Sequence, residues 1–175
     1  VNRGLANAFM TGLMAALERG ADVIVNTDAD NQYDAGCIPD LVAPILADTA
    51  DLVVGCRPIR DIEHFSPVKK RLQILGSAVV RGLSRTSVRD ATSGFRALNR
   101  ETALRTHTFG DYTYTLETLI QAGANGLRVV SVEIETNGPT RTSRLMRSTR
   151  QYVMRSALDM LRVYAIYAPL RAYLT

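Results

Sequence analysis

The stretch from Val23 to Asp34 constrains the fold more than any other part of the chain. It begins with Val23-Ile24-Val25, three apolar residues typical of a buried strand, and continues into Asp28 and Asp30. Two carboxylates cannot be left unpaired in an apolar core, so the strand has to end near this point. Because ligands of open α/β sheets bind beyond the carboxyl ends of the strands, we expect a polar site here.

The two acids of this stretch favour a metal site. Residues at i and i+2 of a strand point to the same side, so Asp28 and Asp30 are expected to share one hard divalent cation, Mg²⁺ or Mn²⁺. A cation held by one or two carboxylates commonly also binds phosphate oxygens of a substrate. The alternative is a solvated turn whose acids cap the next helix, and the acid pair alone leaves both interpretations open.

Apolar periodicity predicts that helices and strands alternate along the chain, as in a mostly parallel α/β sheet with right-handed crossovers. The 175 residues, 46% of them hydrophobic, fit one domain with a proper core. The predicted helices span residues 1–19, 38–48, 67–83, 102–106 and 114–122, and the later strands 52–56, a short strand ending at residue 98, and 129–134, the last at a sheet edge. The side chains predicted to face inward include Leu5, Phe9, Leu13 and Leu17, then Leu41, Val42, Ile45 and Leu46, then Leu72, Leu75, Val79 and Leu83, whereas Glu117 is predicted to face outward.

The basic residues are concentrated late in the chain. From Arg141 to the end there are seven arginines and one acid, Asp159, so this tail has a net charge of +6. The preceding 140 residues have a net charge of −2, which gives the whole chain +4. Residues 148–175 are predicted to form an amphipathic helix, either at a membrane interface or docked on the sheet. Earlier, Lys69, Lys70 and Arg71 crowd a helix start, where an anionic ligand or a solvated face would account for them.

Several classes of protein are disfavoured by composition. The sequence contains no basic motif interleaved with aromatic residues, which would indicate nucleic-acid binding. It also contains no run of eighteen uncharged apolar residues, which would predict a membrane span. Cys37 and Cys56 follow no metal or redox spacing, so neither is a candidate catalytic thiol.

Four sequence boxes occur in order along the chain: the run from Gly20 to Tyr33, the Val-Val-Gly-Cys-Arg box ending at Arg57, the Asp90 to Arg96 box and the Pro139 to Leu145 box. Together they resemble the family 2 glycosyltransferases, and most of all their polyprenyl-phosphate branch, which includes dolichyl-phosphate mannose synthases. The resemblance implies a GT-A (Rossmann-like) domain over residues 1–147, followed by the amphipathic segment 148–175. It also implies an opening portion that binds the nucleotide base and precedes this chain, because the topology is expected to start with a strand.

The resemblance also implies the roles of single residues. Asp28 and Asp30 match the metal-binding acids, Gln32, Arg57 and Arg96 match donor-binding positions, and Asp90 matches a catalytic position. The acceptor and donor phosphates are implied to bind Arg71, Arg141, Ser143 and Arg144, and the weakest matches are Asp111 and Glu117.

The implied activity is metal-dependent, inverting transfer of a sugar from a nucleotide-sugar to a polyprenyl phosphate at the cytoplasmic face of a membrane. An ionised phosphate acceptor needs no strong general base, whereas a sugar hydroxyl acceptor, the alternative within the family, would need one near Asp111 or Glu117. A non-catalytic module that binds membrane surfaces through the basic tail is the alternative from another class. The sequence does not predict the oligomeric state.

Overall fold

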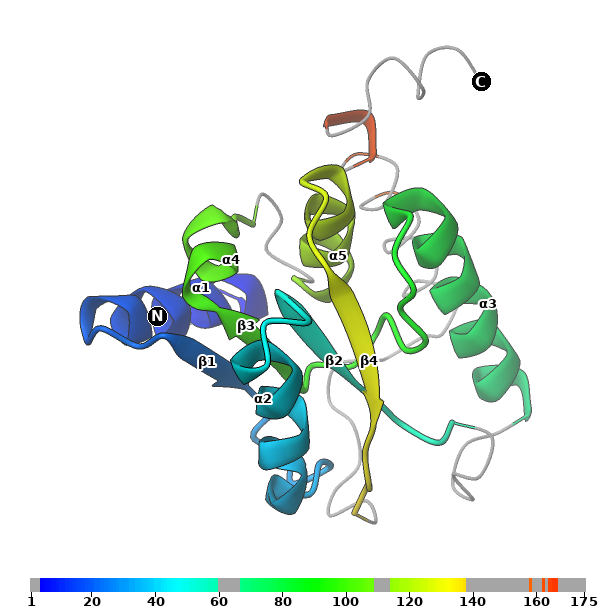
Figure 1. Cartoon of the computed structure of the whole chain (residues 1–175). Coiled ribbons are helices and arrows are strands. Elements are labelled where there is room, and N and C mark those ends of the chain that lie inside the picture. The colour runs from blue at the N-terminus through cyan, green and yellow to red at the C-terminus, as the bar shows by residue number, and fades with distance from the viewer. Residues whose placement is uncertain are drawn as a thin grey trace.

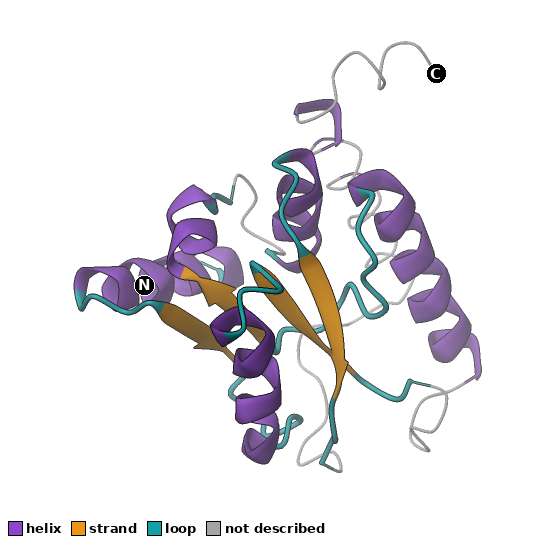
Figure 2. Cartoon of the chain, viewed as in Figure 1, coloured by secondary structure: helices purple, strands orange, loops and turns teal. Residues whose placement is uncertain are grey.

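A four-stranded sheet lies between layers of helices (Figures 1 and 2). The computed structural model describes residues 4–59, 67–108 and 114–137, together with residues 158, 162 and 164–166. The strands are β1 (Val23–Asn26), β2 (Leu52–Cys56), β3 (Arg96–Asn99) and β4 (Val129–Glu133). The helices are α1 (Leu5–Glu18), the 3₁₀ helix η1 (Ala35–Cys37), α2 (Ile38–Leu46), α3 (Pro67–Ser84), α4 (Arg100–Arg105) and α5 (Thr115–Ala124).

The strand order is β1-β3-β2-β4, and the sheet is mixed. β3 pairs antiparallel with both β1 and β2, whereas β2 and β4 pair in parallel, so β1, β2 and β4 all run in one direction. This confirms the predicted α/β class and the position of β4 at an edge of the described sheet, but the sheet is mixed where a mostly parallel one was predicted, because β3 lies antiparallel between β1 and β2. The carboxyl ends of β1, β2 and β4, and the loop that enters β3, therefore lie at the same edge of the sheet.

β1 is less buried than its apolar sequence predicts. All four of its residues are only partly covered, because β1 is the outermost strand of the described sheet on that side. The central strand β2 is the one that matches the prediction of a buried strand, since Leu52, Val53 and Val54 are all inaccessible to solvent.

The two faces of the sheet have separate cores. α2 covers the face that carries Val53 and Ala97, and α3 and α5 cover the face that carries Val54 and Leu98. α1 and α4 pack beside Ile24 at the β1 end. At the start of α4, the Asn99 side chain caps the helix by accepting a hydrogen bond from the Thr102 amide (2.8 Å).

Several predicted inward positions are wrong. Leu5, Leu46, Leu75 and Val79 are exposed, and α3 instead buries Ser77, Val80 and Ser84. Glu117, predicted to face outward, is buried at 3% exposure, because Leu116 to Ala122 of α5 are covered on all sides. The amphipathic helix predicted for residues 148–175 falls almost entirely outside the described residues and stays a prediction.

Candidate functional site

Three loops meet at the edge where β1 and β2 end. Arg96, the first residue of β3, lies opposite Asn26 at the end of β1 and opposite Val54 near the end of β2. The turn after β1, the residues after β2 and the segment 90–95 before β3 are therefore neighbours. A bridge between Tyr33 and Thr136 adds the segment that follows β4.

A buried ion pair joins two of these loops. The Arg57 Nε–H donates to Asp90 Oδ2 at 2.7 Å and its Nη2 donates to Asp90 Oδ1 at 3.0 Å, a bidentate contact. Arg57 is 7% exposed and Asp90 is fully buried. Burial by itself would lower the pKa of Arg57, but the charge of Asp90 and its hydrogen bonds raise it above its ordinary value. Arg57 is therefore a fixed cation at the sheet edge.

The same guanidinium reaches the loop that contains the acid pair. Its Nη2 also donates to Thr92 Oγ1 at 2.7 Å, and its Nη1 donates to Gln32 Oε1 at 3.4 Å. The backbone N–H of Gln32 in turn donates to Asp30 Oδ1 at 3.1 Å. A chain of polar contacts thus runs from Asp90 through Arg57 and Gln32 to Asp30.

Asp28 lies on the inner side of this turn, against the chain at Gly94. The Tyr33 hydroxyl accepts a hydrogen bond from the Gly94 amide at 3.0 Å, and its interaction with the Asp28 carboxylate lowers the pKa of Asp28. A Cβ atom at position 94 would lie 2.5 Å from Asp28 Oδ2, so only glycine leaves room for the carboxylate. Tyr33 is itself buried and stacks on Phe95, with 5.2 Å between the ring centroids.

The electrostatics of Asp28 suit a divalent cation. Burial raises the pKa of Asp28, the charge of Asp30 raises it further, and Arg57 lowers it, with the result above the ordinary 3.8. Two carboxylates held this close repel each other, and a cation between them would relieve that repulsion. Within the described ranges, no three His, Cys, Asp or Glu side chains cluster as ligands, so a cation here would need oxygens from elsewhere, such as those of a bound phosphate.

The orientation of the two acids has a different origin from the one predicted. β1 ends at Asn26, so Asp28 and Asp30 lie in the turn beyond it and strand alternation does not apply to them. Asn26 Nδ2 donates to the Gly94 carbonyl and to the Tyr114 hydroxyl, both at 2.7 Å. These bonds hold the end of β1 against the loop that precedes β3.

The sequence matches the description "Glycosyl transferase family 2" over residues 1–106. The chain belongs to the family 2 glycosyltransferases. It is 35% identical over 142 residues to the UDP-N-acetylglucosamine–dolichyl-phosphate N-acetylglucosaminyltransferase of Methanococcus voltae, covering 77% of this chain and 56% of the relative. It is 30% identical over 137 residues to the undecaprenyl-phosphate mannosyltransferase of Micrococcus luteus, covering 75% of this chain and 56% of that relative. The chain thus spans about half the length of these relatives.

Solved structures show the same fold. Glucosyl-3-phosphoglycerate synthase of Mycobacterium tuberculosis, in complex with phosphoglyceric acid, superposes with a TM-score of 0.67 at 18% identity, over 97% of this chain and 56% of that one. The same enzyme in complex with Mn²⁺, UDP and phosphoglyceric acid gives 0.67 at 19% identity, over 95% and 55% of the two chains. The GT-A-like α/β fold expected for this family 2 chain is therefore confirmed.

The structure brings five of the predicted site residues of this family 2 chain to one sheet edge: Asp28, Asp30, Gln32, Arg57 and Asp90. Arg96 is at the same edge but is buried, and its guanidinium donates to the carbonyls of Ser93 (2.8 Å), Ala91 (2.9 Å) and Thr115 (2.8 Å). Arg96 therefore holds the loop that carries Asp90, and its predicted direct contact with a donor stays a prediction.

The other predicted residues have no described contact with this cluster or fall outside the described residues. Arg71 is exposed on α3, and Glu117 is buried in α5. Asp111, Arg141, Ser143 and Arg144 fall outside the described residues.

Sequence reasoning missed four polar residues of the site: Asn26, Tyr33, Thr92 and Tyr114. A signal for three of them was present, because Asn26 directly follows the apolar strand, Tyr33 ends the box that begins at Gly20, and Thr92 lies inside the box from Asp90 to Arg96. Nothing in the local sequence links Tyr114 to Asn26, which lies 88 positions earlier.

Proposed function

We propose that this chain carries the catalytic edge of a metal-dependent glycosyltransferase that moves a sugar from a nucleotide-sugar donor to a polyprenyl phosphate with inversion. The observation that carries the proposal is the acid pair Asp28 and Asp30 beside the buried cation Arg57. A donor of this class leaves as a nucleoside diphosphate, so charge develops on phosphate oxygens as the sugar departs.

Asp28 and Asp30 are the residues proposed to hold Mg²⁺ or Mn²⁺. When bound, such a cation supplies charge stabilisation to the leaving diphosphate. The close approach of Gly94 restricts the position of the Asp28 carboxylate, and the Gln32 backbone N–H donates to Asp30, so contacts within the chain position both carboxylates before a ligand binds. Relatives solved with Mn²⁺ and UDP are consistent with this assignment.

Arg57 and Asp90 have complementary parts in the proposal. Arg57 contributes a positive charge, and its Nη1 faces Gln32 on the donor side. Both Asp90 oxygens accept hydrogen bonds from Arg57, and Asp90 Oδ1 also accepts from Thr92 at 3.0 Å. We therefore assign Asp90 the role of positioning Arg57 and the loop, in place of the catalytic role predicted from the sequence.

A lipid phosphate is the acceptor that the relatives favour, since both act on polyprenyl phosphates by name. Its phosphate oxygen is ionised near neutral pH and attacks without a strong base, which suits a site whose buried acid is already paired. Arg71, Arg141, Ser143 and Arg144 are proposed to bind the phosphates, because guanidinium groups bind them bidentately.

No helix in the described part of the chain is long and apolar enough to cross a bilayer. We propose a peripheral position at the cytoplasmic face of the membrane.

The proposal is tested by a transfer assay. The protein is incubated with Mn²⁺, UDP-N-acetylglucosamine or GDP-mannose, and undecaprenyl phosphate in detergent, and the glycolipid product is measured. Arg144→Ala is expected to raise the KM for the lipid phosphate at least tenfold with an unchanged melting temperature. Arg105→Ala, which removes an exposed arginine of α4, is the matched control. Transfer to a sugar hydroxyl that survives Arg144→Ala would contradict the lipid-phosphate assignment.

A further inference from the structure

α3 leaves three large apolar side chains exposed, although the residues that it buries most deeply include two serines. Ser77, Val80 and Ser84 are buried, whereas Ile74, Leu75 and Val79 are 42%, 62% and 44% exposed. Helical spacing puts Ile74, Leu75 and Val79 on the side of α3 opposite Val80. Leu75 and Val79 are four positions apart and are therefore neighbours on the helix surface, and exposed apolar side chains grouped in this way form a candidate interaction surface.

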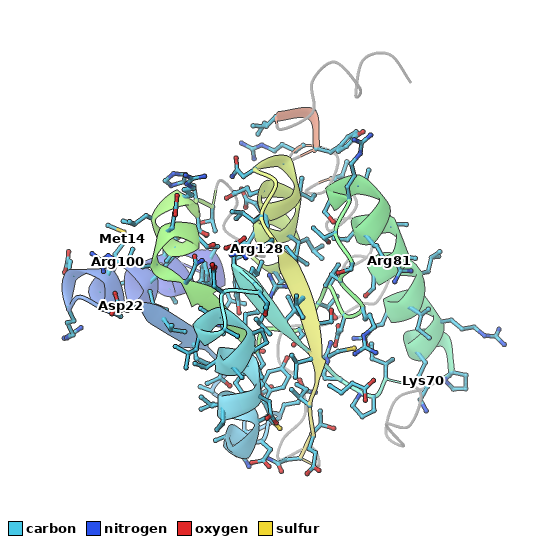
Figure 3. All side chains as sticks on the ribbon, viewed as in Figure 1. Met14, Asp22, Lys70, Arg81, Arg100 and Arg128 are labelled. Carbon is cyan, nitrogen blue, oxygen red and sulfur yellow. The ribbon has the colours of Figure 1, made fainter. Side chains whose placement is uncertain are left out.

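The same helix carries only positive charge. Residues 67–89 contain no Asp or Glu, and their basic residues are Lys69, Lys70, Arg71, Arg81, Arg85 and Arg89. Arg71, Arg81 and Arg85 are exposed. Figure 3 shows Lys70 near the start of α3 and Arg81 near its end, so basic residues lie at both ends of the apolar patch. An apolar stripe bordered by cations is the pattern of a helix that lies on an anionic lipid surface.

We propose that the α3 face formed by Ile74, Leu75, Val79, Arg71 and Arg81, together with Arg85 just beyond the end of the helix, docks on an anionic lipid bilayer. Charge decides between the occupants. In a two-fold dimer that pairs this face with itself, the all-basic helix would lie against its own copy, and the chain's own tail from Arg141 onward carries +6. Both are electrostatically unfavourable, whereas the lipid surface is complementary.

Docking through α3 would also place the candidate site close to the membrane, an argument that rests on the proposed function. α3 begins at the end of the molecule where β2 and β4 finish, so its first turns lie at the edge that carries the acid pair (Figure 1). With α3 on the bilayer, that edge lies next to the surface where the phosphate of a polyprenyl lipid is located.

The test is flotation of the full chain with vesicles. Phosphatidylcholine vesicles are compared with vesicles that also contain phosphatidylglycerol. Leu75→Asp is expected to lower the partition coefficient on the anionic vesicles at least tenfold, and Arg81→Gln about fivefold. Leu46→Asp, the same change at an exposed leucine of α2, is the matched control and should leave partitioning within about twofold.

Any one of three results would overturn the inference. The first is equal partitioning of Leu75→Asp and Leu46→Asp, and the second is no preference of the wild type for anionic vesicles. The third is a dimer that Leu75→Asp converts to a monomer. A fall of more than about 5 °C in the melting temperature of Leu75→Asp would mean that the chain itself covers this face, and would also overturn it. Mn²⁺-dependent UDP binding is measured on the same variants: its absence throughout counts against the proposed function alone, and its retention beside lost vesicle binding supports the docking face.

Discussion

Removing the carboxylate of Asp90 should strongly destabilise the fold. Asp90 is fully buried and holds both Nε and Nη2 of Arg57, so Asp90→Ala leaves a guanidinium that is 7% exposed without its counter-ion. Breaking a buried pair in this way costs about 3–5 kcal/mol, a large part of the roughly 5–15 kcal/mol that stabilises a typical domain. For a chain of this length the melting temperature should fall by about 6–20 °C.

The matched control is the exposed pair between Arg89 and Glu133. It has a similar N–O distance, 2.9 Å, but its side chains are 48% and 81% exposed, so Glu133→Gln should cost less than about 1 kcal/mol. Urea unfolding followed by circular dichroism measures both variants. A second variant, Arg57→Met with Asp90→Val, should recover at least about 1 kcal/mol relative to Asp90→Ala, because an apolar pair leaves no buried charge. If Asp90→Ala loses no more stability than Glu133→Gln, the pair is not the anchor described above.

Two further predictions concern Gly94 and Asp51. Gly94→Ala should weaken Mn²⁺ binding at least about tenfold in a titration, because the new Cβ would displace the Asp28 carboxylate; Gly12→Ala, where nothing lies within 4 Å, should leave Mn²⁺ binding unchanged. Hydrogen bonds from Arg128 lower the pKa of Asp51 in the folded state, so Asp51 stabilises the fold above its ordinary pKa of 3.8, and this contribution is lost as the pH falls through the folded-state value (Figure 3 labels Arg128). The difference in melting temperature between wild type and Asp51→Asn should therefore be present at pH 7 and shrink below about pH 3.8; a constant difference would contradict the assignment.

The strands and the edge that carries the site follow from local sequence. Each apolar run ends in residues that cannot be buried alone, and this places Asp28, Asp30 and Arg57 at the carboxyl ends of β1 and β2. Their pairing does not follow, because it depends on β3 lying between β1 and β2. That insertion brings Asp90 to Arg57, which precedes it by 33 positions, and no local pattern records such a contact.

The orientation of α3 shows the limit of periodicity. The spacing of Leu75 and Val79 is helical, but spacing does not fix which side of a helix faces the core. α3 packs on α5 through small residues, with Gly123 lying against the backbone of Ser84, and this close approach turns Ser77 and Ser84 inward. The larger apolar side chains are consequently left outside. Glu117 was misplaced for a related reason, since its charge suggested a solvated face on a helix that is covered all round.

The central claim is that Asp28 and Asp30 hold a divalent cation on a nucleoside diphosphate. Calorimetric titration of the protein with UDP and with GDP, each with and without Mn²⁺, tests it most directly. The account predicts binding that requires Mn²⁺ and that is lost in Asp28→Asn and in Asp30→Asn, while both variants keep a wild-type circular dichroism spectrum. Mn²⁺-dependent binding that survives in both variants would contradict it.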